Sequence, residues 1–332
     1  MKESIFISVI SYILAVVLIV VGVPLISEVL YSSFSEEISR GDHKKEYKVY
    51  HEYPELPSPS GKLTNENKLD GEVSESNSFG LDERTEGLLK RDKPIICIVI
   101  DDFGYSLEEY VVKAIKDLPI TISIIPFLER SKEVYQIARR FGKEVILHIP
   151  MEAYRNEGNE KRYIRTSMSE EQIVSFLEEA FQEIDAEGIN NHMGSKATED
   201  ERVMTAVISF LRKKNKFFLD SITTPNTVGM RKARECGMVP LKRDIFLDNY
   251  STRYHILDQL ENMEKIARTK GYCIAIGHAR KGTLHTLAKW YHKNKDKYYF
   301  LSLGDLYKSL DFEKKKLGLK SAFPLLNCTT LH

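Results

Sequence analysis

Short apolar segments alternate with longer segments of helical periodicity over the C-terminal two thirds of the chain. The apolar segments are rich in Ile and Val, and continuous runs of this kind are typical of strands buried on both faces of a parallel sheet. We predict strands at 95–100, 120–125, 144–149, 217–220, 273–277 and 299–303, with shorter ones near Ile189 and within 240–246. Strand–helix alternation indicates a parallel α/β fold. Seven or eight strands in about 215 residues favour a closed or nearly closed barrel.

The segments between the strands carry signals for the start of a helix. Three of them match the capping-box pattern: Ser106-x-x-Glu109, Ser169-x-x-Gln172 and Thr198-x-x-Glu201. In that pattern a hydroxyl side chain accepts a hydrogen bond from the backbone of the first helical turn. We therefore expect a helix to begin at each of these positions.

The first residues of the chain form one long apolar run. Residues 5–26 include no charged side chain, and about 20 such residues are enough to cross a hydrocarbon core of roughly 30 Å. A cleaved signal peptide has a shorter apolar core and a site of small residues after it, which this sequence lacks. We predict a transmembrane signal anchor over residues 1–27. The positive-inside tendency places the rest of the chain outside the cytoplasm, as a membrane-anchored, extracytoplasmic (periplasmic) domain.

The apolar periodicity is lost after this run. Residues 51–80 contain three prolines, many Ser, Asn and Glu, and few aliphatic residues. Such a segment cannot bury enough apolar surface to offset the entropy of ordering it. We predict a disordered, flexible linker over 28–92, a folded domain over 93–310 and a C-terminal tail over 311–332.

Composition and motif content exclude several functional classes. The chain has 48 Lys and Arg against 48 Asp and Glu, and nucleic-acid binders usually carry a basic surplus, so we expect no nucleic-acid partner. None of the four cysteines forms a C-x-x-C pair, which argues against a zinc ribbon or a thioredoxin-type site. Neither glycine-rich nucleotide-binding motif occurs, so nucleotide binding by those routes is not supported.

Polar and ionisable residues follow the predicted strands. They are Asp101 and Asp102, His148, Asn190 to His192, Asp220, Arg243 and Asp244, and His278. Each one alone has a structural alternative, since a strand-end Asp often caps the next helix and a lone His is often a satisfied core residue. In parallel α/β folds, however, the carboxyl ends of the strands form one rim, where ligands bind. Six such strand ends together favour a functional site.

This set of residues has the chemistry of a metal-dependent hydrolase. The adjacent carboxylates of Asp101 and Asp102 repel each other unless a cation lies beside them. Two histidines and one carboxylate suit zinc, or another divalent ion such as cobalt, nickel, manganese or iron, and leave open positions for water and substrate. Such a metal activates water and polarises a carbonyl. A second carboxylate could take a proton from that water, and a histidine on the far rim could protonate the leaving group.

Six blocks of sequence occur in the order known from one family. They are Ile100 to Ser106, Leu147 to Glu152, Asn190 to Ser195, Asp220-Ser221, Arg243-Asp244-x-Phe246-Leu247-Asp248 and Ile276-Gly277-His278. On these blocks the chain resembles the divergent polysaccharide deacetylase family over essentially residues 93–310. The resemblance implies an irregular (β/α)7 barrel. It also implies kinship with metal-dependent carbohydrate esterases that remove N- or O-acetyl groups from polysaccharides.

The resemblance assigns metal ligands, with one departure. The second Asp of the pair, Asp102, corresponds to a metal ligand. The better-known deacetylases take both histidines from one His-x-x-x-His motif, whereas here His148 is followed four positions later by Glu152. The second histidine would then be His192, from the next strand.

The resemblance also assigns catalytic roles. Asp101 corresponds to the base, and His278 corresponds to the late histidine that acts as acid. The residues at positions that orient these two groups are Asp220, Arg243 and Asp244.

Three functions fit these observations to different extents. The leading one is a metal-dependent deacetylase that acts on a cell-envelope polysaccharide, tethered to the membrane through its N-terminal helix. The alternative is a catalytically silent envelope protein that binds glycan, or an assembly partner, through the inherited site. A glycosidase is weaker, because it needs two carboxylates but not the histidines. The presence of both Asp residues and all three His residues favours catalysis.

Overall fold

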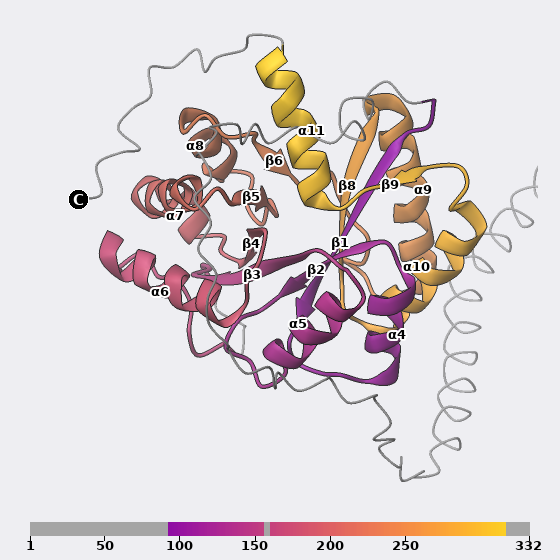
Figure 1. Cartoon of the computed structure of the whole chain (residues 1–332), viewed down its shortest axis with the longest axis horizontal. Coiled ribbons are helices and arrows are strands. Elements are labelled where there is room, and N and C mark those ends of the chain that lie inside the picture. Colours follow the sequence, from indigo (N-terminus) through magenta and orange to yellow (C-terminus); the bar gives the residue numbers. More distant parts are fainter. Residues whose placement is uncertain (1–91, 156–159, 317–332) are drawn as a thin grey trace, which may run out of the picture. The chain divides into compact units, whose positions relative to one another are not determined.

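The computed structural model of the chain describes residues 92–155 and 160–316. These residues form one sheet surrounded by helices (Figure 1). The strands are β1 (Ile95–Phe103), β2 (Ile120–Ile124), β3 (Val145–Met151), β4 (Gly188–Met193), β5 (Phe217–Asp220), β6 (Leu241–Lys242), β7 (Ile245–Phe246), β8 (Tyr272–His278) and β9 (Tyr299–Phe300). The helices are α4 (Glu109–Asp117), α5 (Ser131–Arg140), α6 (Glu170–Glu183), the 3-10 helix η3 (Ala197–Glu199), α7 (Glu201–Lys213), α8 (Gly229–Glu235), α9 (Arg253–Lys270), α10 (Lys281–Asn294) and α11 (Leu303–Lys316).

The strand order makes the sheet curl back on itself. The order is β6-β5-β4-β3-β2-β1-β8-β7, with β9 beside β1, and all pairs are parallel. The two ends, β6 and β7, are separated along the chain only by Arg243 and Asp244. The Arg243 N–H donates to the Asp220 carbonyl (2.9 Å), and the Asp244 N–H donates to the Ile274 carbonyl (2.8 Å). This short segment therefore bridges β5 and β8.

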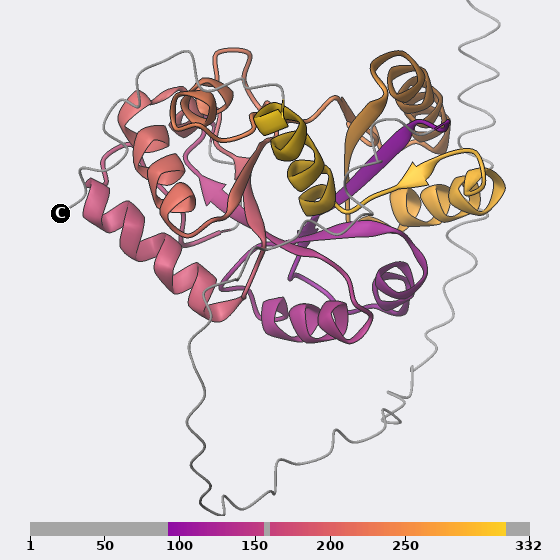
Figure 2. The same cartoon turned by 45° about the horizontal axis from the view of Figure 1, so that its top comes forward.

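The predicted parallel α/β architecture is confirmed. The finer expectation of a seven-stranded barrel is met only in part, because the bridging segment replaces a continuous seventh strand. Helices α6 and α7 lie side by side on one side of the curled sheet, and α9 and α10 lie together on the other (Figures 1 and 2). Both views show the other helices outside the curve of the sheet, whereas α11 lies across its open side and packs Leu303 and Leu306 against the inner face.

One of the three predicted helix starts is confirmed. Ser169 forms the reciprocal capping box at the start of α6. Helix α7 is capped instead by Asp200, whose side chain accepts from the Val203 N–H (2.9 Å), while Thr198 lies in the preceding 3-10 helix. Helix α4 begins three residues after Ser106, without a side-chain cap. A capping side chain must belong to the extended residue directly before the helix. In α4 and α7 that residue is Glu108 and Asp200, and not the Ser106 and Thr198 that the sequence pattern indicated.

The strands separate two apolar clusters. Alternate side chains of β1, such as Ile96 and Ile98, pack outward against the helices. The others, such as Cys97 and Val99, pack inside the curved sheet, as the two-residue period of a strand requires. Helix α11 closes the inner cluster with Leu303 and runs beyond position 310, where we placed the end of the domain.

The predicted anchor over residues 1–27 lies outside the described residues, as does nearly all of the linker predicted over 28–92. The tail predicted over 311–332 is described only as far as residue 316, inside α11. Within 92–155 and 160–316, no helix is long and apolar enough to cross a membrane.

Candidate active site

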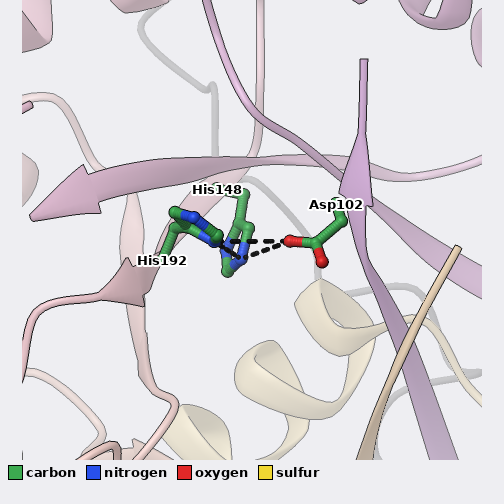
Figure 3. A group of neighbouring side chains, drawn as sticks. All are labelled: Asp102, His148 and His192. Carbon is green, nitrogen blue, oxygen red and sulfur yellow. Dashed lines mark hydrogen bonds and ion pairs between the residues drawn. The ribbon is translucent and has the colours of Figure 1, made fainter. Parts of the chain in front are cut away.

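Three of the predicted residues meet at the carboxyl edge of the sheet (Figure 3). Asp102 comes from β1, His148 from β3 and His192 from β4. Asp102 Oδ1 lies 3.4 Å from His148 Nε2 and 3.3 Å from His192 Nδ1. The two imidazole nitrogens are 3.0 Å apart. The structure thus brings together the three residues predicted as metal ligands, from three different strands.

An irregularity at the end of β1 places two adjacent carboxylates on the same side. In a regular strand Asp101 and Asp102 would point to opposite faces of the sheet. The pairing of β1 with β2 shifts register between Ile100 and Phe103, and Asp102 has a positive φ of 64°. As a result both carboxylates approach the same imidazole nitrogen, His148 Nε2, at 3.6 Å from Asp101 and 3.4 Å from Asp102.

The cluster fits a divalent metal. Asp102 Oδ1 is one of two buried side-chain atoms among the described residues that make no hydrogen bond, and such atoms are rare unless a ligand satisfies them. Bonds of about 2.0–2.2 Å in tetrahedral geometry hold neighbouring ligand atoms roughly 3.3–3.6 Å apart. The two separations from Asp102 Oδ1, 3.3 and 3.4 Å, lie in this range, and the two nitrogens are slightly closer, at 3.0 Å. These residues could hold zinc or a similar ion and leave further coordination positions open.

The electrostatics of the cluster call for a positive charge. Burial would raise the pKa of Asp102, but His148 and His192 hold it well below its usual range. Burial would lower the pKa of His192, but its contacts with Asp102 and Glu160 raise that pKa to about 9. In the absence of a metal, a proton on His192 therefore supplies the charge between two carboxylates. A bound cation would take over that role.

Asn190 connects the buried Asp101 to the cluster. Its Nδ2 donates to both carboxylate oxygens of Asp101 (2.9 and 3.1 Å). Its Oδ1 lies 2.8 Å from His148 Nδ1 and also accepts from the Ser123 hydroxyl. Because Oδ1 can only accept, the proton of His148 is on Nδ1, and Nε2 is free to bind a metal. The sequence showed Asn190 only as a polar neighbour of His192.

His278 lies beside Asp101, since the two residues pair across β1 and β8. Its Nδ1 is 2.7 Å from Asp248 Oδ1. The buried Asp248 also accepts from the Thr283 hydroxyl (2.6 Å) and from the His278 N–H (3.1 Å). Burial would lower the pKa of His278, but Asp248 raises it above its usual value. Asp248 orients the ring and stabilises its protonated form, as expected of a general acid.

Asp248 was missed as a site residue. It ends the sequence block that begins at Arg243, and it follows β7 and Leu247. Its place directly after the apolar pair Phe246-Leu247, at the end of a strand, could have identified it as a site residue.

Asp220 and Arg243 shape the neighbouring loop. Asp220 is fully buried and accepts from the Ile222 N–H (2.9 Å) and from a hydroxyl of the same loop. Arg243 donates to the Ile222 carbonyl (3.1 Å), and its guanidinium lies 3.7 Å from the centre of the Phe246 ring. Phe246 in turn stacks on His278 at 5.8 Å. Asp220 and Arg243 thus hold the loop after β5, and Arg243 also contacts Phe246, which packs on His278.

The structure does not bring Asp244 to this group. Its carboxylate binds Lys270 Nζ (2.8 and 2.9 Å) and accepts from the Ile274 N–H (3.0 Å). Ile274 precedes His278 by four residues in β8, which corresponds to about 13 Å along a strand. Asp244 therefore stabilises the junction of α9 and β8 and has no contact with the cluster.

Two glutamates of the segment after β3 have separate roles. Glu152, four positions after His148, accepts from Lys196 Nζ (2.6 Å) and from the Thr166 N–H (2.6 Å), and it does not join the cluster. Glu160 Oε1 lies 3.3 Å from His192 Nε2 and accepts a hydrogen bond from the Tyr105 hydroxyl. Glu160 was not predicted as a site residue, because it lies in a segment without periodicity.

The fold and the site together define a polysaccharide deacetylase-type α/β protein, with a curled parallel sheet and an Asp/His/His cluster at its carboxyl edge. A model of the family described as divergent polysaccharide deacetylase matches residues 98–307. The chain belongs to this family, as the six sequence blocks predicted.

Relatives are found in bacteria. "Uncharacterized protein YibQ" of Escherichia coli (strain K12) is 35% identical over 205 residues, which are 60% of this chain and 64% of the relative. A protein of Haemophilus influenzae is 33% identical over 215 residues, 64% of this chain and 77% of that one. The crystal structure of protein ATU2773 from Agrobacterium tumefaciens C58 superposes with a TM-score of 0.60 at 23% identity, covering 64% of this chain and 89% of that one. That likeness supports the fold. The match leaves about a third of YibQ uncovered.

Proposed function

We propose that the protein is a metal-dependent deacetylase that hydrolyses acetyl groups of a cell-envelope polysaccharide. The observation that carries the proposal is the buried Asp102 oxygen without a hydrogen bond, placed between two imidazole nitrogens and beside a second carboxylate. This oxygen has only the two imidazoles beside it and accepts no hydrogen bond, and a cation held between the three groups would satisfy it. Family membership supplies the substrate class, a polysaccharide.

The chain supplies the residues that such a hydrolysis requires. A divalent metal held by Asp102, His148 and His192 would polarise the acetyl carbonyl and lower the pKa of water; the ligand set favours zinc, with cobalt, nickel, manganese and iron as alternatives. Asp101 takes the proton from the attacking water, and the side-chain amide of Asn190 holds the Asp101 carboxylate in position. His278 protonates the leaving nitrogen or oxygen of the sugar.

The imidazolium form of His278 is maintained by Asp248. The Nδ1 proton of His278 is donated to the Asp248 carboxylate (2.7 Å), which leaves Nε2 as the nitrogen that can protonate a substrate. The stacked Phe246 ring fixes the plane of the imidazole. Asp101 and His278 occupy adjacent strands, so the base and the acid flank one space at the carboxyl edge.

The proposal extends to location. The uncharged run over residues 5–26 is long enough for a membrane anchor, and a flexible linker over 28–92 would let the catalytic domain reach a glycan outside the cytoplasm. Cysteine reporters placed before residue 5 and after residue 30 test this. Labelling of the second reporter alone by a membrane-impermeant reagent on intact cells is expected.

The direct test measures metal content and acetate release of the purified full-length chain beside His192→Ala. We expect close to one divalent metal per wild-type chain, loss of that metal in the variant, and acetate release from acetylated envelope glycans by the wild type alone. A wild type that binds no zinc, cobalt, nickel or manganese would contradict the proposal. Metal binding with retained glycan affinity, but without acetate release, would instead identify a catalytically silent glycan-binding protein.

A further inference from the structure

The two histidines of the cluster present different ring nitrogens to its centre. His148 presents Nε2, whereas His192 presents Nδ1. This difference follows from their origin, since one lies on β3 and the other on β4 and they approach from different directions. A histidine binds a metal through one nitrogen only when the proton resides on the other. Each ring therefore needs its own acceptor at its far nitrogen.

The two far nitrogens face different acceptors. His148 Nδ1 faces the amide oxygen of Asn190 at 2.8 Å, in the fully buried interior. His192 Nε2 faces a carboxylate, Glu160 Oε1, at 3.3 Å. The first acceptor is neutral and comes from a strand, whereas the second is charged and comes from the segment that follows β3.

Glu160 has few contacts besides the one with His192. Its side chain is only 7% exposed, and a carboxylate is costly to bury without a partner. Among the ion pairs of the described residues, Glu160 takes part in one, with His192. Its other contact is the hydroxyl of Tyr105, which follows β1. The carboxylate thus lies between a cluster histidine and a neutral donor.

We propose that Glu160 is a positioning residue of the metal centre, which accepts the Nε2 proton of His192 and so fixes Nδ1 as the metal-binding nitrogen. The inference rests on the proposed function, because it requires the Asp102, His148 and His192 cluster to hold a divalent cation. Carboxylates that accept from a metal-bound histidine fix the orientation of the ring and increase its basicity. Glu160 thereby becomes a fourth residue of the centre without touching the ion.

A purely structural role is the competing explanation. In that case Glu160 would serve to hold its segment against Tyr105, and the contact with His192 would be incidental. The two explanations predict different behaviour for Tyr105→Phe, which removes the Tyr105–Glu160 hydrogen bond but leaves the Glu160–His192 contact.

The test titrates the purified full-length chain with Zn²⁺ against a chelator of known affinity and records the absorption spectrum of the Co²⁺ form. The variants are Glu160→Ala, Glu160→Gln and Tyr105→Phe. Glu179→Gln is the matched control. Glu179 is an exposed carboxylate that pairs with Arg162, two residues after Glu160, and this ion pair lies apart from the three cluster residues. Losing an acceptor of this kind typically weakens metal affinity by about 10- to 100-fold.

We expect Glu160→Ala to lose about 10- to 100-fold in Zn²⁺ affinity and to shift the Co²⁺ spectrum. Glu160→Gln retains an acceptor oxygen and should restore most of the affinity. Tyr105→Phe and Glu179→Gln should bind like the wild type. Wild-type affinity in Glu160→Ala would overturn the inference, and so would an equal loss in Tyr105→Phe. Either result leaves the proposed function standing, whereas a wild type that binds no metal removes the proposed function itself.

Discussion

The two edges of the sheet differ in how one carboxylate is satisfied. At the amino edge, Glu144 accepts from the Thr121 hydroxyl (2.9 Å) and from the Gly304 N–H (2.8 Å) at the start of α11. Asp244, on the segment that bridges the sheet, pairs with Lys270 and accepts from the Ile274 N–H. Each of these carboxylates has donors supplied by the chain itself.

At the carboxyl edge the chain also supplies donors to Asp101, Asp220 and Asp248, but one carboxylate oxygen has none. Asp101 and Asp102 lie side by side, and Asp102 Oδ1 has no donor. The difference teaches where to look for function in this fold. A buried carboxylate that the chain satisfies contributes to stability, and one that it does not satisfy indicates a ligand from outside.

The largest expected effect is that of Asp102→Ala. Removing a ligand oxygen should lower metal affinity by more than about 100-fold and abolish acetate release. The metal-free variant also loses the ion pairs of Asp102 with His148 and His192, so both quantities are measured below the unfolding transition. Metal analysis and an assay of acetate release check these expectations. Wild-type metal affinity in the variant would contradict the contrast between the edges.

Asp248→Asn should separate catalysis from metal binding. The substitution removes the negative charge that raises the pKa of His278 and so disfavours the protonated ring. We expect kcat to fall by about 100-fold or more, while metal content stays at the wild-type level. The limb of the pH–rate profile that reports loss of the acid should also move to lower pH. An unchanged profile would remove His278 from the role of acid.

Asp244→Ala, at the amino edge, is the counterpart of Asp102→Ala at the carboxyl edge. It leaves the Ile274 N–H and the Lys270 amine without their acceptor, so the free energy of unfolding should fall by about 1–3 kcal/mol. Metal affinity and acetate release, measured below the unfolding transition, should stay within a few-fold of wild type. A loss of activity above about 100-fold in a fully stable variant would instead restore the catalytic role that the sequence suggested for Asp244.

The smallest effect is expected for Glu152→Gln. Burial would raise the pKa of Glu152, but Lys196 and Thr166 lower it to about 2 from an ordinary value of 4.5. The ionised form therefore stabilises the fold above pH 4.5, and this contribution is lost as the pH falls towards 2. Urea unfolding of wild type and variant should differ modestly at pH 7 and converge as the pH falls from 4.5 to about 2. A difference that does not change with pH would exclude the ionic contribution.

The sequence predicted those features that depend on apolar patterning. The buried strands appear as runs of Ile and Val, and β5 was predicted with its observed bounds, Phe217–Asp220. The convergence of Asp102, His148 and His192 was also predictable, since parallel strands end at one edge and all three residues follow such ends.

Features that depend on local backbone geometry or on the path of loops could not be predicted from the sequence. The register shift that turns Asp102 towards His148 has no signature in the residues around it. Asp244 was assigned to the site because it follows a predicted strand and matches an orienting position of the family it resembles, but in the structure its carboxylate pairs with Lys270. Glu160 contacts His192 across a segment whose path is not encoded by any periodicity.

The origin of the three ligands on separate strands has a consequence for folding. Asp102, His148 and His192 are 46 and 44 residues apart in sequence, so the unfolded chain offers no local chelate of the kind that a His-x-x-x-His motif provides. Metal would then bind the native state almost exclusively. Its binding free energy would therefore add to the free energy of unfolding, by about 2.7 kcal/mol when the free metal concentration is 100 times the dissociation constant. The ion would act as a cross-link that forms only after β1, β3 and β4 have found their places in the sheet.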